Sequence, residues 1–148
     1  MRRPYLNSYF LPASAVPEFW DLAEPFIRRV LKYHPFIKDT TDVLALLMDE
    51  HATLVVYTED GRVTGAAVME VHEYPSARVG NILALSGKPG FLKRIGEAEA
   101  ALVRWSSQKG CASMSMLGRP GWAKTVGTLG YSQRPALTAW KSIGDRHE

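Results

Sequence analysis

Residues 87–90, Gly-Lys-Pro-Gly, are one group in this sequence that could bind a ligand. They follow a short apolar stretch and precede an amphipathic one, so they predict a turn between a strand and a helix. A helix that begins at such a turn presents unpaired backbone N–H groups and the positive end of its dipole, and both favour an anion. The turn is therefore a candidate ligand site at the carboxyl end of a strand.

A second group of polar residues lies near the ends of two neighbouring predicted strands. Glu70 and His72 are two residues apart and therefore share one face of a strand, and Asn81 lies on the next strand. Carboxylates and imidazoles are the residue types that most often exchange protons with a substrate. The alternative interpretation, which the sequence alone favours, is that these are ordinary solvent-facing polar residues of a sheet.

A succession of strands and helices must position these groups. Apolar residues recur at helical spacing before Pro35, whereas the Asp60-Gly61 pair predicts a hairpin. The small residues that follow at 65–67 predict a close approach of a helix or ligand. The predicted strands are residues 5–11, 53–58, 63–72, 77–86, 111–117 and 135–143, and the predicted helices are residues 14–34, 42–51, 91–109 and 122–129. This order indicates a mixed α+β fold with about four helices and a mostly antiparallel sheet of about six strands. The strands before and after the third helix form a parallel pair.

Length and composition limit the classes of function. The chain has 148 residues, which predicts one domain over residues 1–143 and a polar tail at 144–148. The net charge of +3 is spread along the sequence, so a solvated basic surface is a better interpretation than a nucleic-acid site. We expect no membrane span, no metal site and no secretion signal, and the single Cys111 fits a cytoplasmic setting.

The order of elements resembles the GNAT superfamily, the Gcn5-related N-acetyltransferases. The resemblance covers nearly the whole chain and is best over residues 79–140. Residues 119–131, Arg-Pro-Gly-Trp-Ala-Lys-Thr-Val-Gly-Thr-Leu-Gly-Tyr, are similar to the short helix, the Gly-Phe pair and the start of the last strand in that family. The Gly121-Trp122 helix start also resembles small GNAT-like proteins of tailed bacteriophages.

The resemblance implies a cofactor site. In the family, the strand corresponding to residues 77–86 splays from the strand at 111–117, and the gap admits the pantetheine arm of acetyl-CoA. Backbone groups at Leu83, Ala84 and Leu85 would pair with the pantetheine amides. The turn residues implied to hold the pyrophosphate are Gly87, Lys88, Gly90, Lys93 and Arg94. A general base is expected on the central strands, where Glu70, His72 and Asn81 are the candidates.

The sequence departs from the family pattern in three places. Bulky residues at 91–95 replace the glycine-rich part of the phosphate loop, so Lys88, Lys93 or Arg94 would have to supply charge. The tyrosine that often protonates the leaving thiolate is replaced by Val126, which leaves Tyr131, Tyr74 or water. Arg119 stands where an asparagine commonly opens the short helix.

Two hypotheses follow. The first is an acetyl-CoA-dependent N-acyltransferase in which a small-molecule or protein amine attacks the thioester directly. The second is a GNAT-fold protein that has lost its cofactor and acts as a binding or structural subunit with protein partners, in a phage particle. If the turn binds pyrophosphate, a bulky β-branched residue at Gly87 or Gly90 is expected to abolish CoA binding and leave the fold intact.

Overall fold

The computed structural model describes residues 4–116, 123–133, 139 and 141–143. Its contacts divide the chain into two units, residues 1–118 and residues 119–148, each of which is described by itself. The first unit holds the sheet and most of the described helices, and the described part of the second holds one short helix. The extent of a single domain over residues 1–143 stays a prediction.

The described elements follow the predicted order of strands and helices. In chain order they are β1 (Asn7–Leu11), the 3-10 helix η1 (Ala13–Ala15), α1 (Val16–Leu31), α2 (Thr40–Met48), β2 (Thr53–Glu59), β3 (Arg62–Tyr74), β4 (Ala77–Gly87), the 3-10 helix η2 (Phe91–Arg94), α3 (Ile95–Gln108), β5 (Ser113–Met116) and α4 (Ala123–Thr128). The five strands form one sheet in the order β1, β2, β3, β4, β5, antiparallel except for the parallel pair β4 and β5. The predicted mixed α+β class with one parallel pair is confirmed. Most of the predicted strand at 135–143 lies outside the described residues.

Local sequence explains the start of α2 and the β2–β3 turn. The Asp39 carboxylate caps α2 by accepting a hydrogen bond from the backbone N–H of Thr41 at 2.9 Å. Asp60 and Gly61 both have positive φ, 51° and 74°, which is the conformation that the two central residues of a tight hairpin turn require. The predicted hairpin is therefore confirmed at the predicted residues.

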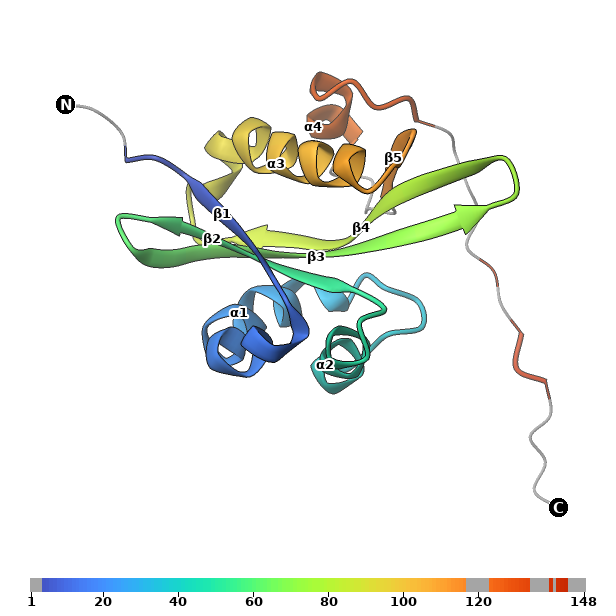
Figure 1. Ribbon diagram of the computed structural model, residues 1–148, viewed down its shortest axis with the longest axis horizontal. Helices are drawn as coiled ribbons and strands as arrows, with labels where there is room; N and C mark the ends of the chain where they lie inside the picture. Colours follow the sequence, from blue (N-terminus) through green and yellow to red (C-terminus); the bar gives the residue numbers. More distant parts are fainter. Residues whose placement is uncertain (1–3, 117–122, 134–138, 140, 144–148) are drawn as a thin grey trace, which may run out of the picture. The chain divides into compact units, whose positions relative to one another are not determined.

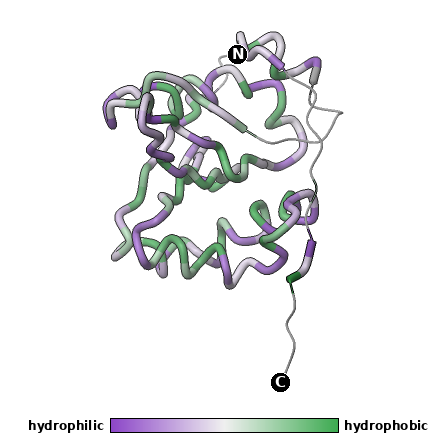
Figure 2. Tube along the Cα trace, turned by 90° about the vertical axis from the view of Figure 1, so that its right-hand side faces the viewer, coloured by the Kyte–Doolittle hydropathy of each residue, from purple (hydrophilic) through white to green (hydrophobic). Residues whose placement is uncertain are grey.

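The sheet of the first unit separates two apolar cores (Figure 1). Helices α1 and α2 cover one face, and α3 covers the other. Figure 2 shows apolar and polar residues intermixed along the trace, as expected where each element buries one side only. The core beneath α1 and α2 includes Ile27, Leu47 and Val68, and the core beneath α3 includes Met69 and Leu102.

Strand β4 carries a bulge in its middle. Met69 of β3 is paired with Ile82 and Val68 with Ala84, so Leu83 is the extra residue on β4. A bulge bends its strand and disrupts the regular ladder at that point. The bulge also reverses the alternation of side chains, so that Asn81 and Ala84 lie on the same face of the sheet.

Candidate active site

A row of polar side chains crosses three strands on the face of the sheet that α1 and α2 cover. Glu70 of β3 is paired directly with Asn81 of β4, and Asn81 is paired directly with Ser115 of β5. Directly opposed residues have Cβ atoms only about 5 Å apart, close enough for their polar groups to meet. Because side chains alternate along a strand, Glu70 and His72 share the face of Val68, which belongs to the core beneath α1 and α2.

Hydrogen bonds run along this row in a fixed direction. The Ser115 hydroxyl donates to Asn81 Oδ1 at 2.9 Å, and Asn81 Nδ2 donates to Glu70 Oε1 at 2.9 Å. His72 Nε2 lies 3.2 Å from the same Glu70 oxygen. A carboxylate can only accept, so His72 carries its proton on Nε2 in this arrangement. Glu70 Oε1 therefore accepts two hydrogen bonds, which fix the orientation of the carboxylate.

The row is partly shielded from water but can be reached from it. The Glu70 side chain is 19% exposed and the His72 side chain is 40% exposed. A carboxylate held in this way can accept a proton from a bound group, directly or through one water. Within the described residues, Glu70 Oε2 makes no hydrogen bond, so it is the oxygen available for that exchange.

The structure brings together the three residues that the sequence singled out. Glu70, His72 and Asn81 form one hydrogen-bonded group, and their catalytic role stays a prediction. Sequence reasoning missed Ser115, because only the register of β5 against β4 places a serine opposite Asn81. Tyr74 lies edge-on to His72, with ring centroids 6.3 Å apart, and is 58% exposed. Tyr131 belongs to the second unit, so the identity of a proton donor to the leaving group also stays a prediction.

The carboxyl end of β4 extends beyond the described part of its ladder with β5. The parallel ladder runs from Val79 opposite Ser113 to Ile82 opposite Met116. Residues 83–87 continue as strand along β3, and within the described part of the chain no strand pairs with them on the β5 side. The bulge at Leu83 comes directly after the last described pair of this ladder, Ile82 opposite Met116. Among the described residues, the backbone polar groups that this stretch turns toward the β5 side have no strand partner, so a ligand that pairs as a strand does could meet them there.

The turn after β4 is organised by Phe91. Its ring packs beneath the turn: a Cβ at Gly87 would lie 2.2 Å from Phe91 Cγ, and one at Gly65 would lie 2.7 Å from Phe91 Cε1. The expected close approach to the small residues of β3 is confirmed, and the neighbour is Phe91. A larger residue at Gly87 would displace a core side chain, so it cannot test ligand binding alone. Gly90, with φ +92°, has open space around it but needs a backbone conformation that side chains disfavour.

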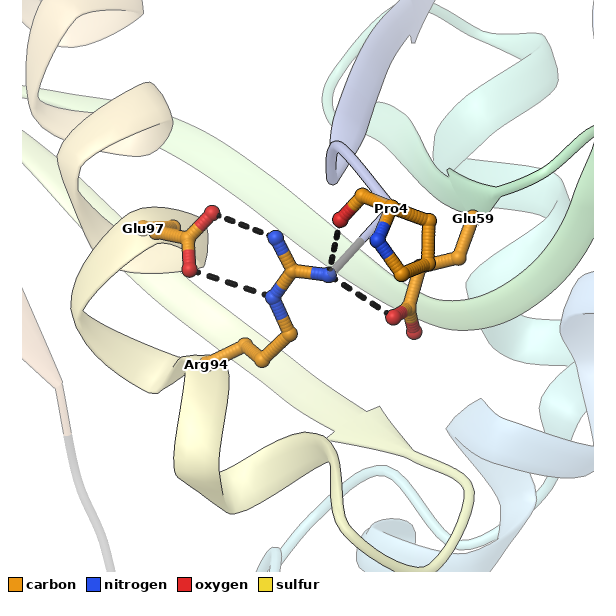
Figure 3. Close-up of polar contacts among 4 residues, drawn as sticks. All are labelled: Pro4, Glu59, Arg94 and Glu97. Carbon is orange, nitrogen blue, oxygen red and sulfur yellow. Dashed lines mark hydrogen bonds and ion pairs between the residues drawn. The ribbon is translucent and has the colours of Figure 1, made fainter. Parts of the chain in front are cut away.

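Arg94 connects the start of α3 to two other segments of the chain by hydrogen bonds, as Figure 3 shows. Its side chain is 8% exposed, and Nε and Nη2 donate to the two carboxylate oxygens of Glu97 at 3.1 and 2.7 Å. Nη1 donates to Glu59 Oε1 at 2.8 Å and to the Pro4 carbonyl at 2.6 Å. Its donors are therefore directed to the chain itself, whereas Lys88 and Lys93, also predicted for the turn, are exposed.

The pKa of Glu59 reflects its ion pair with Arg94. Burial raises the pKa of the Glu59 carboxyl, but the hydrogen bond from Arg94 and the nearby charges of Lys88 and Arg94 outweigh burial, so the pKa is lowered from 4.5. The carboxylate therefore stays charged near neutral pH and holds the guanidinium in place.

These features fit a ligand that combines an extended amide chain with phosphates. Residues 83–87 offer backbone groups to amides, and exposed Lys88 and Lys93 offer charge beyond them. Three backbone N–H groups of the turn are already used: Lys88 N–H donates to the Thr64 carbonyl, Phe91 N–H to the Lys88 carbonyl and Lys93 N–H to the Gly90 carbonyl. A phosphate bound at this turn would therefore depend more on side-chain charge than one bound in a glycine-rich loop.

The described residues give no support to two other kinds of site. Among them, no three His, Cys, Asp or Glu residues are placed to hold a metal ion. No helix in this part of the chain has both the length and the apolar character to cross a membrane.

Comparison with solved structures identifies the fold. An aminoglycoside acetyltransferase from an uncultured soil metagenomic sample, solved in complex with sisomicin, has a TM-score of 0.74 and 13% identity, covering 95% of this chain and 97% of that chain. The aminoglycoside N-acetyltransferase AAC(6')-Iy, in complex with CoA, has a TM-score of 0.70 and 20% identity, with 95% and 97% covered. A GCN5-related N-acetyltransferase from Ralstonia eutropha has a TM-score of 0.67 and 18% identity, with 94% and 99% covered. No family model and no curated protein matches the sequence. The predicted resemblance to GNAT acetyltransferases is confirmed at the level of the fold.

Proposed function

We propose that this protein is an acetyl-CoA-dependent N-acyltransferase that transfers an acetyl group to an amine by direct attack. The observation that carries the proposal is the hydrogen-bonded row Ser115, Asn81, Glu70 and His72, which lies beside the last described pair of the β4–β5 ladder. Structures of the same fold support it, since one is a complex with CoA and another a complex with sisomicin.

Glu70 is the general base in this proposal. An ammonium group must lose a proton before its nitrogen can attack, and Glu70 Oε2 accepts that proton directly or through water. His72 and Asn81 are positioning residues, because both hydrogen-bond to the other carboxylate oxygen. Acetyl-CoA would supply the thioester: the C–N bond forms at its carbonyl carbon and the C–S bond breaks. The proton that the nitrogen gives up as the amide forms balances the proton that the departing thiolate takes up.

The cofactor site in this proposal is the end of β4. Leu83, Ala84 and Leu85 offer backbone groups to the pantetheine amides, and Gly87 and Gly90 shape the turn. Charge comes from Lys88 and Lys93. Arg94 acts indirectly, by holding the start of α3 against Glu59 and the N-terminal segment.

One observation favours a second candidate, a cofactor-free binding or structural subunit. Phe91 fills the space beneath the turn, and turn N–H groups bond internally where a phosphate loop would present them to a ligand. Under this alternative the partners are proteins of an assembly, such as a phage particle. Under the first candidate the enzyme acts in the cytoplasm.

Calorimetric titration of the full chain with acetyl-CoA, paired with thermal unfolding, separates the two candidates. Micromolar binding, with stabilisation of about 2.7 kcal/mol at a hundred times Kd, is expected for the enzyme. Absence of heat and of any shift at millimolar acetyl-CoA would overturn the enzymatic proposal and favour the subunit.

Turnover with a panel of primary amines then tests the base. Glu70→Gln is expected to lower kcat by about a hundredfold or more while acetyl-CoA affinity stays unchanged. Glu73→Gln is the matched control, because Glu73 lies on the same strand but is 67% exposed and pairs with Arg78. Equal effects of the two substitutions would exclude Glu70 as the base.

A further inference from the structure

Arg29 of α1 reaches the turn at the end of β4. Its Nη1 donates to the carbonyl oxygen of Gly87 at 3.0 Å, although the two residues are 58 positions apart. The guanidinium also lies over the Phe26 ring, 5.6 Å from its centroid. An exposed arginine is thus held in a defined place beside the predicted phosphate turn.

The charge of Arg29 is not neutralised by a carboxylate, whereas the charges of the neighbouring arginines are. Arg28 forms a two-point ion pair with Glu24, and Arg94 pairs with Glu97 and Glu59. Within the described residues, Arg29, Lys88 and Lys93 make no ion pair with a carboxylate. Arg29 therefore lies at the end of β4, with exposed Lys88 and Lys93 on the segment that follows it. The charge of Lys88 also acts on the Glu59 carboxylate, so Arg29 is the cation at this end whose charge is most available to a ligand.

The two faces of the sheet contribute different cations. Arg29 approaches from the α1 face, whereas the segment with Lys93 leads into α3 on the opposite face (Figure 1). The bond to Gly87 uses one of the five N–H donors of the guanidinium. The others keep the fork geometry that binds phosphate oxygens in pairs.

We propose that Arg29 binds a phosphate group of the CoA substrate and compensates for the missing glycine-rich loop. This inference rests on the proposed function. It assigns to α1 a binding residue for a turn whose own N–H groups are partly used internally. Arg29 thereby adds to Lys88 and Lys93 as a determinant of affinity for the phosphorylated substrate.

The test measures Kd by calorimetry for wild type, Arg29→Gln and Arg28→Gln with acetyl-CoA, acetyl-dephospho-CoA and acetyl-pantetheine. Loss of a charged hydrogen-bonding partner is expected to weaken acetyl-CoA binding about ten- to a hundredfold in Arg29→Gln. Arg28→Gln, one residue away, is expected to bind within about twofold of wild type because its charge is already paired with Glu24. Acetyl-pantetheine, which has no phosphate, should bind all three proteins equally.

The other outcomes are distinct. If Arg29→Gln weakens binding of acetyl-CoA alone, the group that Arg29 contacts is the 3'-phosphate. If it weakens binding of acetyl-dephospho-CoA equally, that group is the pyrophosphate. Equal weakening for acetyl-pantetheine would show that Arg29 only shapes the backbone at Gly87 and would overturn the inference. Equal behaviour of Arg29→Gln and Arg28→Gln, in a protein whose wild type binds, would also overturn it but leave the proposed function standing. Failure of wild type to bind any of the three ligands would overturn both.

Discussion

At the scale of single residues, the polar row distinguishes the two oxygens of one carboxylate. Glu70 Oε1 accepts hydrogen bonds from Asn81 and His72, so the carboxylate cannot rotate without breaking both. Asn81 can donate to Glu70 only with its oxygen turned away, and Ser115 meets that oxygen. The orientation of the candidate base therefore depends on a residue two strands away.

Ser115→Ala is expected to lower kcat about fivefold, the effect of one net hydrogen bond of about 1 kcal/mol, because Asn81 loses its fixed orientation. KM for acetyl-CoA should not change. Steady-state kinetics against varied amine and acetyl-CoA check this. Ser113→Ala, which changes an exposed serine two residues earlier on the same strand, is the control and should match wild type.

Gly87 and Gly96 make a second comparison at this scale. Gly87→Ala places a methyl group against the Phe91 ring and is expected to lower the free energy of unfolding by about 1–3 kcal/mol. Gly96 lies in α3, and a methyl group added there would meet nothing within 4 Å, so Gly96→Ala should raise the free energy of unfolding by about 0.4–1 kcal/mol. Urea denaturation measures both, and destabilisation by both substitutions would contradict the role given to Phe91.

At the scale of elements, Arg94 joins three segments at the turn. It links the first turn of α3, through Glu97, to the end of β2, through Glu59, and to the chain before β1, through the Pro4 carbonyl. A buried guanidinium bonded to several acceptors resists displacement, since removing one partner leaves a charge without compensation. This tie fixes where α3 begins, and hence where the turn with Lys88 and Lys93 lies.

Because the pKa of Glu59 is lowered, its ion pair with Arg94 is sensitive to acid. A carboxyl whose folded pKa lies below its ordinary value of 4.5 stabilises the fold above that pH, and the stabilisation is lost as the pH falls through the folded pKa. The difference in free energy of unfolding between wild type and Glu59→Gln should therefore be largest near pH 7 and shrink below pH 4.5. Urea denaturation at several pH values measures it, and a difference that grows on acidification would contradict the tie.

At the scale of the whole molecule, the positive net charge and the cationic side chains at the end of β4 favour the same kind of ligand. The chain carries a net charge of +3, and the cations at the end of β4 come from both sides of the sheet. Such an arrangement attracts an anionic ligand over a distance that salt shortens, to about 10 Å at 0.1 M ionic strength.

Acetyl-CoA affinity is accordingly expected to fall severalfold between about 0.05 and 0.5 M salt, whereas affinity for uncharged acetyl-pantetheine should stay constant. Calorimetric titrations across that range provide the measurement. Salt independence of acetyl-CoA binding would mean that the cations at this end of the sheet contribute no affinity.

Periodicity and turn chemistry in the sequence are enough to predict most of the elements. Apolar spacing located α1, the Asp60-Gly61 pair located the hairpin, and the alternation of strand and helix after residue 77 predicted the parallel pair. These features are local, so a window of the sequence contains their cause. The same local pattern placed Glu70 and His72 on one face, because that statement needs only the period of a strand.

The tertiary structure alone decided which distant residues meet. The sequence offered Arg94 as a phosphate ligand, but packing directs it to Glu59 and Glu97, while Arg29, which no motif marked, reaches Gly87. The register of β5 places Ser115 in the candidate site. The Phe91 ring fills the space that a side chain at position 87 would need, which is why this position holds a glycine. Each of these contacts joins segments whose relative position depends on how two cores pack against one sheet. Spacing along the chain carries no record of that packing, which is why the sequence could predict the elements and the candidate base but not the partners that orient them.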